Sequence, residues 1–300
     1  MSYSSAGKDF KTKIEKQISN KQDLEKLEEW SEKVLVVKSI KATENDLKKF
    51  HSSSYIDILK KTNVTDDIEA LEKELAQHGL NYDCPVLERN FDFVCRIAGG
   101  TLTAAMLLCR KISRIAINWS GGWHHAQRDE AEGFCYVNDI VLGIQKLQKV
   151  FDKILYVDLD VHHGTVYSSF EPSAIVVQCG ADILFGDRVG QCNVTIKALV
   201  KCVKKIINCN IPCLVLGGGG YNFANTARYW TCITSTIIDT EIDDDIPDCS
   251  EYFTLYTPTY ELRINPGNQK DYNTEEYIAN VIDTIHKYCD FITKNNIIQK

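Results

Sequence analysis

The segment that decides the fold is Tyr156-Val157-Asp158-Leu159-Asp160-Val161-His162-His163-Gly164, an apolar run that ends in alternating acids and histidines. Side chains alternate between the two faces of an extended chain, so Asp158, Asp160 and His162 project on the same side. A carboxylate and an imidazole two residues apart can bind one divalent ion. The segment therefore predicts a strand over Lys153–Leu159 that delivers metal-binding groups. The alternative is that these groups only hydrogen-bond one another at the strand end.

Further short apolar segments are predicted to form strands of the same sheet. They lie at Arg114–Asn118, Ala174–Cys179 and Cys213–Leu216, with helices expected between them at Val137–Val150 and Thr195–Asn208. Strands that alternate with helices pair in parallel, so the predicted fold class is α/β, a parallel sheet flanked by helices on both faces. Other expected elements are a strand at Val34–Ile40 and helices at Asp67–Gln77, Phe93–Cys109, Phe223–Ile238 and Glu275–Ile292.

The carboxyl ends of the predicted strands carry the other unusual residues. His124 and His125 follow the strand at Arg114–Asn118, and Asp182 follows the strand at Ala174–Cys179. In an open parallel sheet such positions meet at one rim, where ligands bind. Asp182 would complete a set of two carboxylates and one imidazole, which leaves a coordination position open for water, as catalytic zinc sites do.

Two kinds of group at this rim indicate proton transfer and carbonyl polarisation. Imidazole titrates near neutral pH, so His124 and His125 are the candidate proton-transfer pair. Tyr221 follows four consecutive glycines, and its phenol is placed to donate a hydrogen bond to a developing oxyanion. A phosphate cradle is the rival interpretation of the glycines, but no Lys-Ser/Thr pair follows them and the net charge is negative.

The bulk composition limits the class of protein. The 300 residues carry 34 basic and 41 acidic groups, a net charge of -7, which argues against a protein held to nucleic acid by phosphate contacts. Such acidity suits a Lys-rich peptide partner, although it is also common in soluble proteins. The 12 cysteines are scattered without a CxxC pair, which favours reduced thiols in an intracellular protein.

The chain is expected to hold one domain. Residues 1–32 form a polar leader, in which Phe10, Ile14 and Ile18 are spaced as on a weakly amphipathic helix and no apolar core of a secretion signal occurs. We expect no apolar run of the roughly 20 residues that a membrane span needs, and so no membrane partner. Residues 33–300 are predicted to form a single α/β domain.

Several motifs together resemble the class I zinc-dependent histone deacetylases, most of all their isotype-8 branch. The resemblance extends from about Val34 to Ile264. It implies an arginase/deacetylase-like fold with a zinc site at the carboxyl ends of the strands, and hydrolysis of N-acetyl-lysine in histone tails or other proteins. It also implies corepressor-type protein partners and a place in the nucleus and cytoplasm. The motifs are Ile117–Ala126 (INWSGGWHHA), Glu132–Asp139 (EGFCYVND), Tyr156–Gly164 (YVDLDVHHG) and Gly217–Asn222 (GGGGYN).

The resemblance further implies a role for each residue around the site. By role, these are the Zn²⁺ ligands Asp160, His162 and Asp182; the general acid and base His125, with its neighbour His124 and the orienting Asp158; Tyr221, which polarises the acetyl carbonyl; Gly133 and Phe134, which line the lysine tunnel; and Asp83, which holds the substrate backbone. Taken by themselves, Phe134 also suits an apolar core and Asp83 also suits a turn.

The sequence departs from the family pattern after Gly164. The family continues with Asp-Gly and several dozen further residues, whereas here Thr165 follows directly. In the family the omitted stretch supplies the carboxylate partner of the second histidine, a tunnel-wall aromatic, structural K⁺ ligands and a central strand. The link that remains between the strands ending at Leu159 and beginning at Ala174 is near the lower limit for a parallel crossover.

These observations leave three hypotheses about activity. The first is an active protein lysine deacetylase with a shortened but folded domain. The second is a catalytically impaired splice or gene-model variant that acts as a binding module. The third keeps the fold but hydrolyses another acetyl-amide, such as an acetyl-polyamine, which an acidic gate beside the tunnel would favour.

Overall fold

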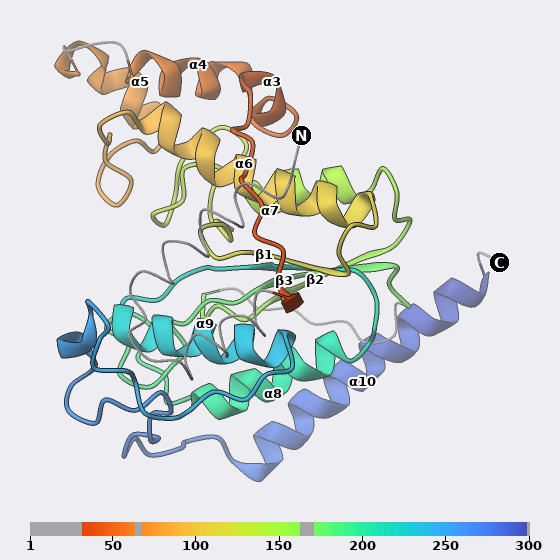
Figure 1. Cartoon of the computed structure of the whole chain (residues 1–300). Coiled ribbons are helices and arrows are strands. Elements are labelled where there is room, and N and C mark those ends of the chain that lie inside the picture. Colours follow the sequence, from red (N-terminus) through yellow and green to blue (C-terminus); the bar gives the residue numbers. More distant parts are fainter. Residues whose placement is uncertain (1–31, 64–67, 163–170, 299–300) are drawn as a thin grey trace.

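The computed structural model describes residues 32–63, 68–162 and 171–298 (Figure 1). A parallel sheet of four strands lies at its centre, in the order β1-β4-β3-β2. The structure confirms the predicted α/β class, the parallel pairing and the four strands predicted to form the sheet. The strands are β1 (Ile115–Asn118), β2 (Ile154–Asp158), β3 (Ala174–Gln178) and β4 (Cys213–Leu216).

Helices lie before, between and after these strands, and those expected from the sequence lie close to their predicted ranges. They are α3 (Glu44–Leu47), α4 (Ser53–Lys61), η1 (Glu69–Leu71), α5 (Glu72–Gln77), α6 (Asn90–Cys109), α7 (Asp139–Leu147), α8 (Ile196–Ile207), α9 (Phe223–Ile237), η2 (Phe253–Tyr256) and α10 (Glu275–Ile298). Side-chain caps fix several starts: the side chain of Thr195 accepts from the Ala198 N–H, and that of Asn222 accepts from the Asn225 N–H.

Each face of the sheet packs against its own pair of helices (Figure 1). Along β3, Val176 belongs to the core formed with α6 and α7, whereas Ile175 and Val177 belong to the core formed with α8 and α9. The alternation of an extended chain explains this division. Every residue of β3 and β4 is buried, as expected of strands covered on both sides.

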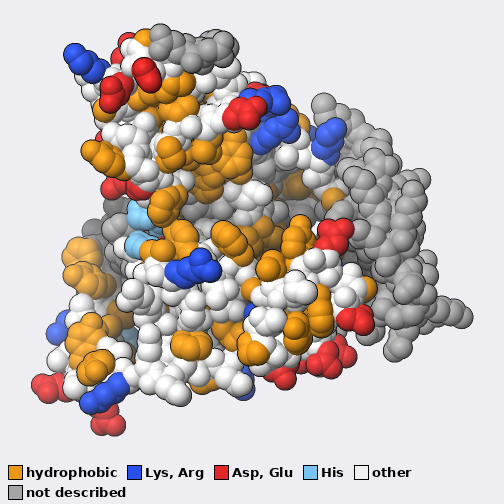
Figure 2. Space-filling view, turned by 90° about the vertical axis from the view of Figure 1, so that its left-hand side faces the viewer, with side chains coloured by type: hydrophobic (Ala, Val, Ile, Leu, Met, Phe, Trp, Pro, Cys, Tyr) orange, Lys and Arg blue, Asp and Glu red, His pale blue; other side chains and the backbone are white. Residues whose placement is uncertain are grey.

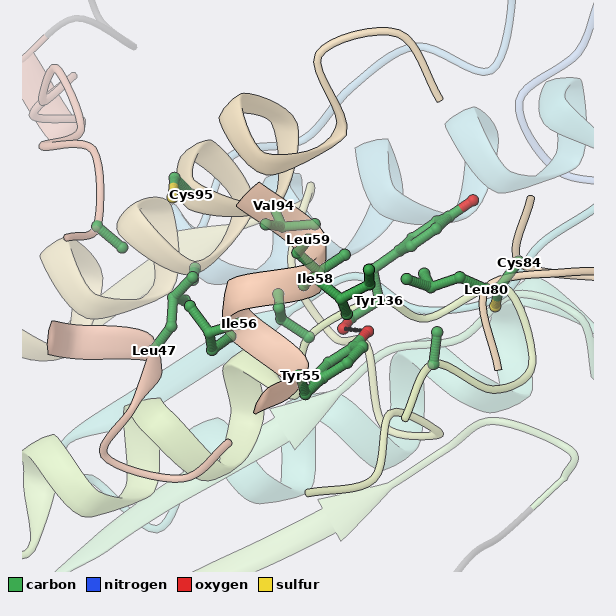
Figure 3. Close-up of a cluster of buried hydrophobic side chains, with 14 of the residues drawn as sticks. Leu47, Tyr55, Ile56, Ile58, Leu59, Leu80, Cys84, Val94, Cys95 and Tyr136 are labelled. Atoms are coloured by element: carbon green, nitrogen blue, oxygen red, sulfur yellow. Dashed lines mark hydrogen bonds between the residues drawn. The ribbon is translucent and has the colours of Figure 1, made fainter. Parts of the chain in front are cut away.

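A second core lies on the outer side of α6, where α3, α4 and α5 pack (Figure 3). Tyr55 and Leu59 of α4 meet Val94 of α6 and Leu80 in this cluster, and each of these four side chains is at most 3% exposed. The Tyr55 hydroxyl donates to the backbone oxygen of Tyr136 at 2.6 Å. This bond joins α4 to the loop that follows His124 and His125.

The predicted strand at Val34–Ile40 is wrong. The segment has no regular structure and lies along α6, where the Ile40 N–H donates to Thr103 Oγ1 at 3.0 Å. A Cβ atom on Gly99 would stand 2.2 Å from the Ile40 oxygen, so the glycine permits this approach. Val34 remains 40% exposed. The Ile40 N–H finds its partner on a helix, and without a strand beside it the segment cannot form a ladder.

The expectation about apolar runs also needs correction. By length and composition α6 is long and apolar enough to cross a membrane, although no sequence stretch was expected to reach that length. In the structure 61% of its apolar window is buried inside the molecule. The helix packs between the sheet and the cluster around α4, which is the position of a core helix in a globular domain.

All four strands end at one level. Asn118 of β1 and Gln178 of β3 both pair with Leu216 of β4, and Asp158 of β2 pairs with Gln178. The residues that follow the strands therefore emerge along one rim of the sheet, as the sequence predicted.

Candidate metal centre

Two acids and one histidine meet at this rim. Asp160 and His162 follow β2, Asp182 follows β3, and their ligand atoms all lie within 4.8 Å of one another. His162 Nδ1 lies 2.8 Å from Asp160 Oδ1 and 3.1 Å from Asp182 Oδ2. Both carboxylates are buried, whereas His162 is exposed to solvent. The predicted ligand set is thus brought together from two neighbouring strands.

The electrostatics of this group fit a divalent cation. Burial and the negative charge of Asp160 raise the pKa of Asp182, because two carboxylates in one buried site repel each other. Burial also acts to raise the pKa of Asp160, but the hydrogen bond from His162 and the charge of His124 outweigh it and lower that pKa. Asp182 Oδ2 is buried and accepts no hydrogen bond. A bound cation would satisfy this oxygen and relieve the repulsion.

Glycines shape the wall behind the carboxylates. The Gly219 N–H donates to Asp160 Oδ2 at 3.1 Å. A Cβ atom on Gly219 would lie 2.7 Å from Asp160 Oδ2 and also 2.7 Å from Asp182 Oδ2. A Cβ atom on Gly180 would lie 2.6 Å from Asp160 Oδ2. Only residues without side chains leave these two oxygens free to converge on an ion.

His124 is held by a carboxylate directly beside the metal group. Its Nδ1 lies 2.7 Å from Asp158 Oδ2, which also accepts from the Tyr156 hydroxyl at 2.5 Å. Its Nε2 lies 3.7 Å from Asp160 Oδ1. Burial lowers the pKa of His124, but the hydrogen bond and charge of Asp158 outweigh it, so the net direction is upward. The predicted pairing of His124 with Asp158 is therefore present in the geometry.

His125 contacts both its neighbour His124 and His162 of the metal group. Its ring meets the His124 ring edge-on, with centroids 4.2 Å apart, and the His162 ring at 5.6 Å. Gly133 packs against it so closely that a Cβ atom there would stand 2.6 Å from His125 Cγ and Cδ2. Gly133 has φ +54°, a conformation that glycine adopts without strain.

Two residues that support the histidine loop were quoted in a motif but given no role by the sequence reasoning. The buried carboxylate of Asp139 accepts from the N–H groups of Gly122 and Trp123. Burial raises the pKa of Asp139. The Asn138 amide donates to the backbone oxygen of His124 at 3.2 Å. The available signal was an acid placed directly before an apolar run, at a position where burial forces it to find donors.

Gln178, at the end of β3, is a further residue that the sequence reasoning missed. It is fully buried, and its Nε2 lies 3.4 Å from both Asp160 Oδ2 and the Gly122 oxygen. Its Oε1 accepts from the Gly180 N–H at 2.8 Å. It thereby joins the metal group to the loops on either side. A lone amide at the end of an otherwise apolar strand was the only signal.

Tyr221 and Phe134 stand on the open side of the site. Their rings meet edge-on with centroids 5.8 Å apart, and Phe134 is 53% exposed. Burial and the charges of Asp160 and Asp182 raise the pKa of Tyr221 to about 12, so its hydroxyl keeps its proton as a donor. Figure 2 shows histidine side chains reaching the surface among hydrophobic ones.

Asp83 lies at the outer edge of the site. Its side chain is exposed, and its Oδ2 accepts from the Gly133 N–H at 2.9 Å. The carboxylate therefore fixes the Gly133–Phe134 turn. The structure brings Asp83 to the rim, next to the residues predicted to line the tunnel.

The comparison with models of known protein families shows the family to which this chain belongs. Residues 11–168 and 165–237 match the model of the histone deacetylase domain, which is more than half of the chain. The chain belongs to the histone deacetylase family. Among its relatives, histone deacetylase 8 of Xenopus tropicalis is 35% identical over 83% of this chain and 85% of its own length. The Danio rerio histone deacetylase 8 is 36% identical over 83% of each chain.

Human histone deacetylase 1 is 33% identical over 83% of this chain and 65% of its own length. Similarity to isotypes 8 and 1 confirms the class I assignment that the motifs predicted. It also confirms the arginase/deacetylase-like fold.

The comparisons also locate the expected interruption of this histone deacetylase domain. The two matched segments of the family model meet at residues 165–168, next to Gly164. The alignment with the Xenopus tropicalis relative spans 317 residues although it uses only 83% of this chain, so that relative contributes more residues to the alignment than this chain does. Residues 163–170, with the junction itself, lie outside the described residues, as does most of the predicted leader 1–32.

Proposed function

We propose that the chain is a zinc-dependent protein lysine deacetylase that hydrolyses N-acetyl-lysine in histone tails or other proteins. The observation that carries the proposal is the convergence of Asp160, His162 and Asp182 within 4.8 Å, beside the His124–Asp158 pair. Membership of the histone deacetylase family supports the reaction class. The names of the isotype 8 and isotype 1 relatives support the substrate class.

The ligand chemistry favours zinc as the ion. Zn²⁺ in catalytic sites takes three protein ligands drawn from imidazole and carboxylate groups and keeps one position open. Asp160, His162 and Asp182 supply that set, and no thiol belongs to the cluster. Bound there, zinc would supply Lewis acidity that polarises an amide carbonyl and makes water more acidic.

The histidine pair handles the protons. His125 is proposed as the general base that accepts a proton from the attacking water and returns it to the lysine amine. His124, held through Nδ1 by Asp158 at 2.7 Å, keeps positive charge available beside the reacting groups, because Asp158 stabilises its protonated form. The edge-on contact of the two rings at 4.2 Å fixes the position of His125 relative to this charged pair.

The open side of the site positions the substrate. Tyr221 donates its hydroxyl proton in a hydrogen bond to the carbonyl oxygen as negative charge develops there. Phe134 and Gly133 are proposed as the walls against which the aliphatic lysine stem packs. Asp83 accepts backbone N–H groups of the peptide at the rim, using oxygen capacity left beyond its bond to Gly133.

Binding partners follow from the same reasoning. The chain has 41 acidic against 34 basic groups, which favours cationic peptides such as acetylated histone tails over nucleic acid. We propose the nucleus and cytoplasm as its compartments and corepressor-type proteins as further partners, on the basis of its family.

The decisive experiment measures zinc and turnover together. The purified chain should hold close to one zinc per molecule and deacetylate an acetyl-lysine peptide in a reaction that a hydroxamate blocks. Asp182→Ala should lose most of the zinc, whereas Asp152→Asn at an exposed position should keep both zinc and activity. Full zinc occupancy in Asp182→Ala would remove that residue from the ligand set.

Bound zinc without turnover would favour the catalytically impaired alternative, in which the fold acts as a binding module. Turnover of acetyl-polyamine but not of peptide would favour the third hypothesis. Sequencing the transcript across the codons for Gly164 and Thr165 would show whether the shortened junction is present in the messenger RNA.

A further inference from the structure

The last helix, α10, stands apart from the layers of the domain. Figure 1 shows it at the lower right of the view, running past α8 on the outer side of that helix. Across residues 275–291 every side chain is exposed except Cys289, which is partly buried. Helices in proteins draw most of their stability from packing an apolar face, and isolated helices are marginal in water. A helix of this length, with an uncovered apolar face, therefore requires a partner.

The apolar residues of α10 follow the pattern of paired helices. Ile278, Val281, Ile285 and Tyr288 are spaced three, four and three residues apart, and each is at least 40% exposed. This is the a/d spacing by which two helices pack side by side. The flanking side chains Tyr277, Ile282 and Phe291, also exposed, widen the same stripe.

The charges on the polar face of α10 do not favour binding to an anionic membrane. Across residues 275–291 it carries Glu275, Glu276, Asp283 and Asp290 against Lys287. Helices that lie on membranes are rich in Lys and Arg on the polar face, because anionic lipids attract them. The acidic face instead suits a protein partner in water.

The exposed area is of the size that a stable dimer needs. The seven exposed apolar side chains of the stripe present roughly 700 Å² in total, close to the about 800 Å² per partner of a standard interface. A second copy of the same helix offers a matching stripe, and pairing it with itself gives a closed two-fold contact.

We propose that α10 pairs with α10 of a second copy of this chain, in antiparallel orientation. A parallel pair would place Glu275 and Glu276 of both copies side by side, where like charges repel. The antiparallel pair instead places each acidic end beside the turn of the other copy in which the charges of Lys287 and Asp290 cancel, so fewer like charges meet.

The antiparallel register also keeps the stripe continuous. Ile278 lies opposite Tyr288 of the second copy, and Val281 lies opposite Ile285 of the second copy. Apolar side chains therefore meet along the whole contact, and the interface needs no residue of the proposed metal centre.

Light scattering after size-exclusion chromatography tests the pairing. The intact chain should run as a dimer with twice the 34.0 kDa mass of one chain. Ile285→Lys places a charge at the centre of the stripe and should raise the dissociation constant about 30-fold or more. Asn280→Lys, with the same added charge outside the stripe, should remain dimeric. A monomer at the highest soluble concentration, or equal dissociation by both variants, would overturn the proposal.

Disulfide trapping tests the orientation, with linked peptides identified by mass spectrometry. In Ile278→Cys/Tyr288→Cys, oxidation should join position 278 of one copy to position 288 of the other. Links between identical positions would overturn the antiparallel arrangement. Circular dichroism and zinc content should match the unmodified chain in every variant, which separates loss of pairing from loss of folding.

Discussion

The carboxylate of Asp187 holds Tyr221 through its backbone, with Oδ2 accepting from the Tyr221 N–H at 2.7 Å. The same oxygen accepts from the Asn222 N–H at 3.2 Å, while Oδ1 accepts from Val189 and Gly190. One nearly buried side chain thus joins the glycine-rich loop to the loop after Asp182. The position of the Tyr221 phenol depends on this link.

Asp187→Asn should therefore slow turnover without releasing zinc. The amide keeps the size of the acid but loses one acceptor oxygen, so the loop of Tyr221 shifts. Misplacement of a catalytic group by about 1 Å costs roughly 100-fold in rate. We expect a loss in kcat of that order, measured beside zinc content. Asp152→Asn is the control for charge, and an unchanged kcat in Asp187→Asn would show that the link is dispensable.

Tyr221→Phe removes the donor itself and leaves the backbone link to Asp187 intact. Loss of one oxyanion donor costs about 100- to 1,000-fold in kcat. Zinc content and thermal stability should stay at the level of the unmodified chain, because the phenol contributes nothing to the ligand set. Steady-state kinetics and metal analysis on the same sample check this. Metal loss would contradict the role assigned to Tyr221.

Gly219→Ala should empty the metal centre. The added Cβ would lie 2.7 Å from Asp160 Oδ2 and 2.7 Å from Asp182 Oδ2, so the two oxygens could not converge on an ion. We expect zinc content far below one per chain, with the helical circular dichroism signal retained. Ser120→Ala, at an exposed position of the same rim, should keep its zinc. A fully loaded Gly219→Ala protein would show that the ion lies elsewhere.

The buried residue His51 should make the fold sensitive to mild acid. It is 2% exposed, its Nδ1 lies 3.2 Å from the Arg128 oxygen, and its Nε2 accepts from the Asn138 N–H at 3.0 Å. Burial lowers the pKa of His51 from 6.5 to about 4. Between these values the unfolded chain binds more protons than the folded chain, so stability falls as the pH falls from 6.5 toward 4. The loss attributable to this group approaches about 3 kcal/mol.

Denaturant unfolding at pH 7 and pH 5 measures this effect. His51→Gln should flatten the dependence of the unfolding free energy on pH, because the amide does not titrate. His286→Gln, at an exposed position of α10, should leave the dependence as it is. An equal slope in the unmodified chain and in His51→Gln would assign the acid sensitivity to other groups.

The sheet could be predicted because its determinants are local. Each strand is a short apolar run that ends at a polar or glycine-rich turn, and the helices between them fix parallel pairing. The metal cluster followed for the same reason, since the carboxyl ends of parallel strands share one rim. Residues that support the site, such as Asp187 and Gln178, bind partners distant in the sequence. Their supporting roles therefore could not be predicted from a local sequence pattern. The Val34–Ile40 segment failed because strand formation depends on a neighbour that the segment itself does not encode.

The direct pairing of β2 with β3 has a consequence for how such enzymes diversify. Main-chain bonds between these strands, rather than the connecting residues, set the spacing between the first two ligands and the third. A change in the length of the connection would therefore leave the spacing between Asp160 and Asp182 unchanged, provided that β2 and β3 stay paired. The proposed metal centre and the residues of the connection can thus vary independently of each other.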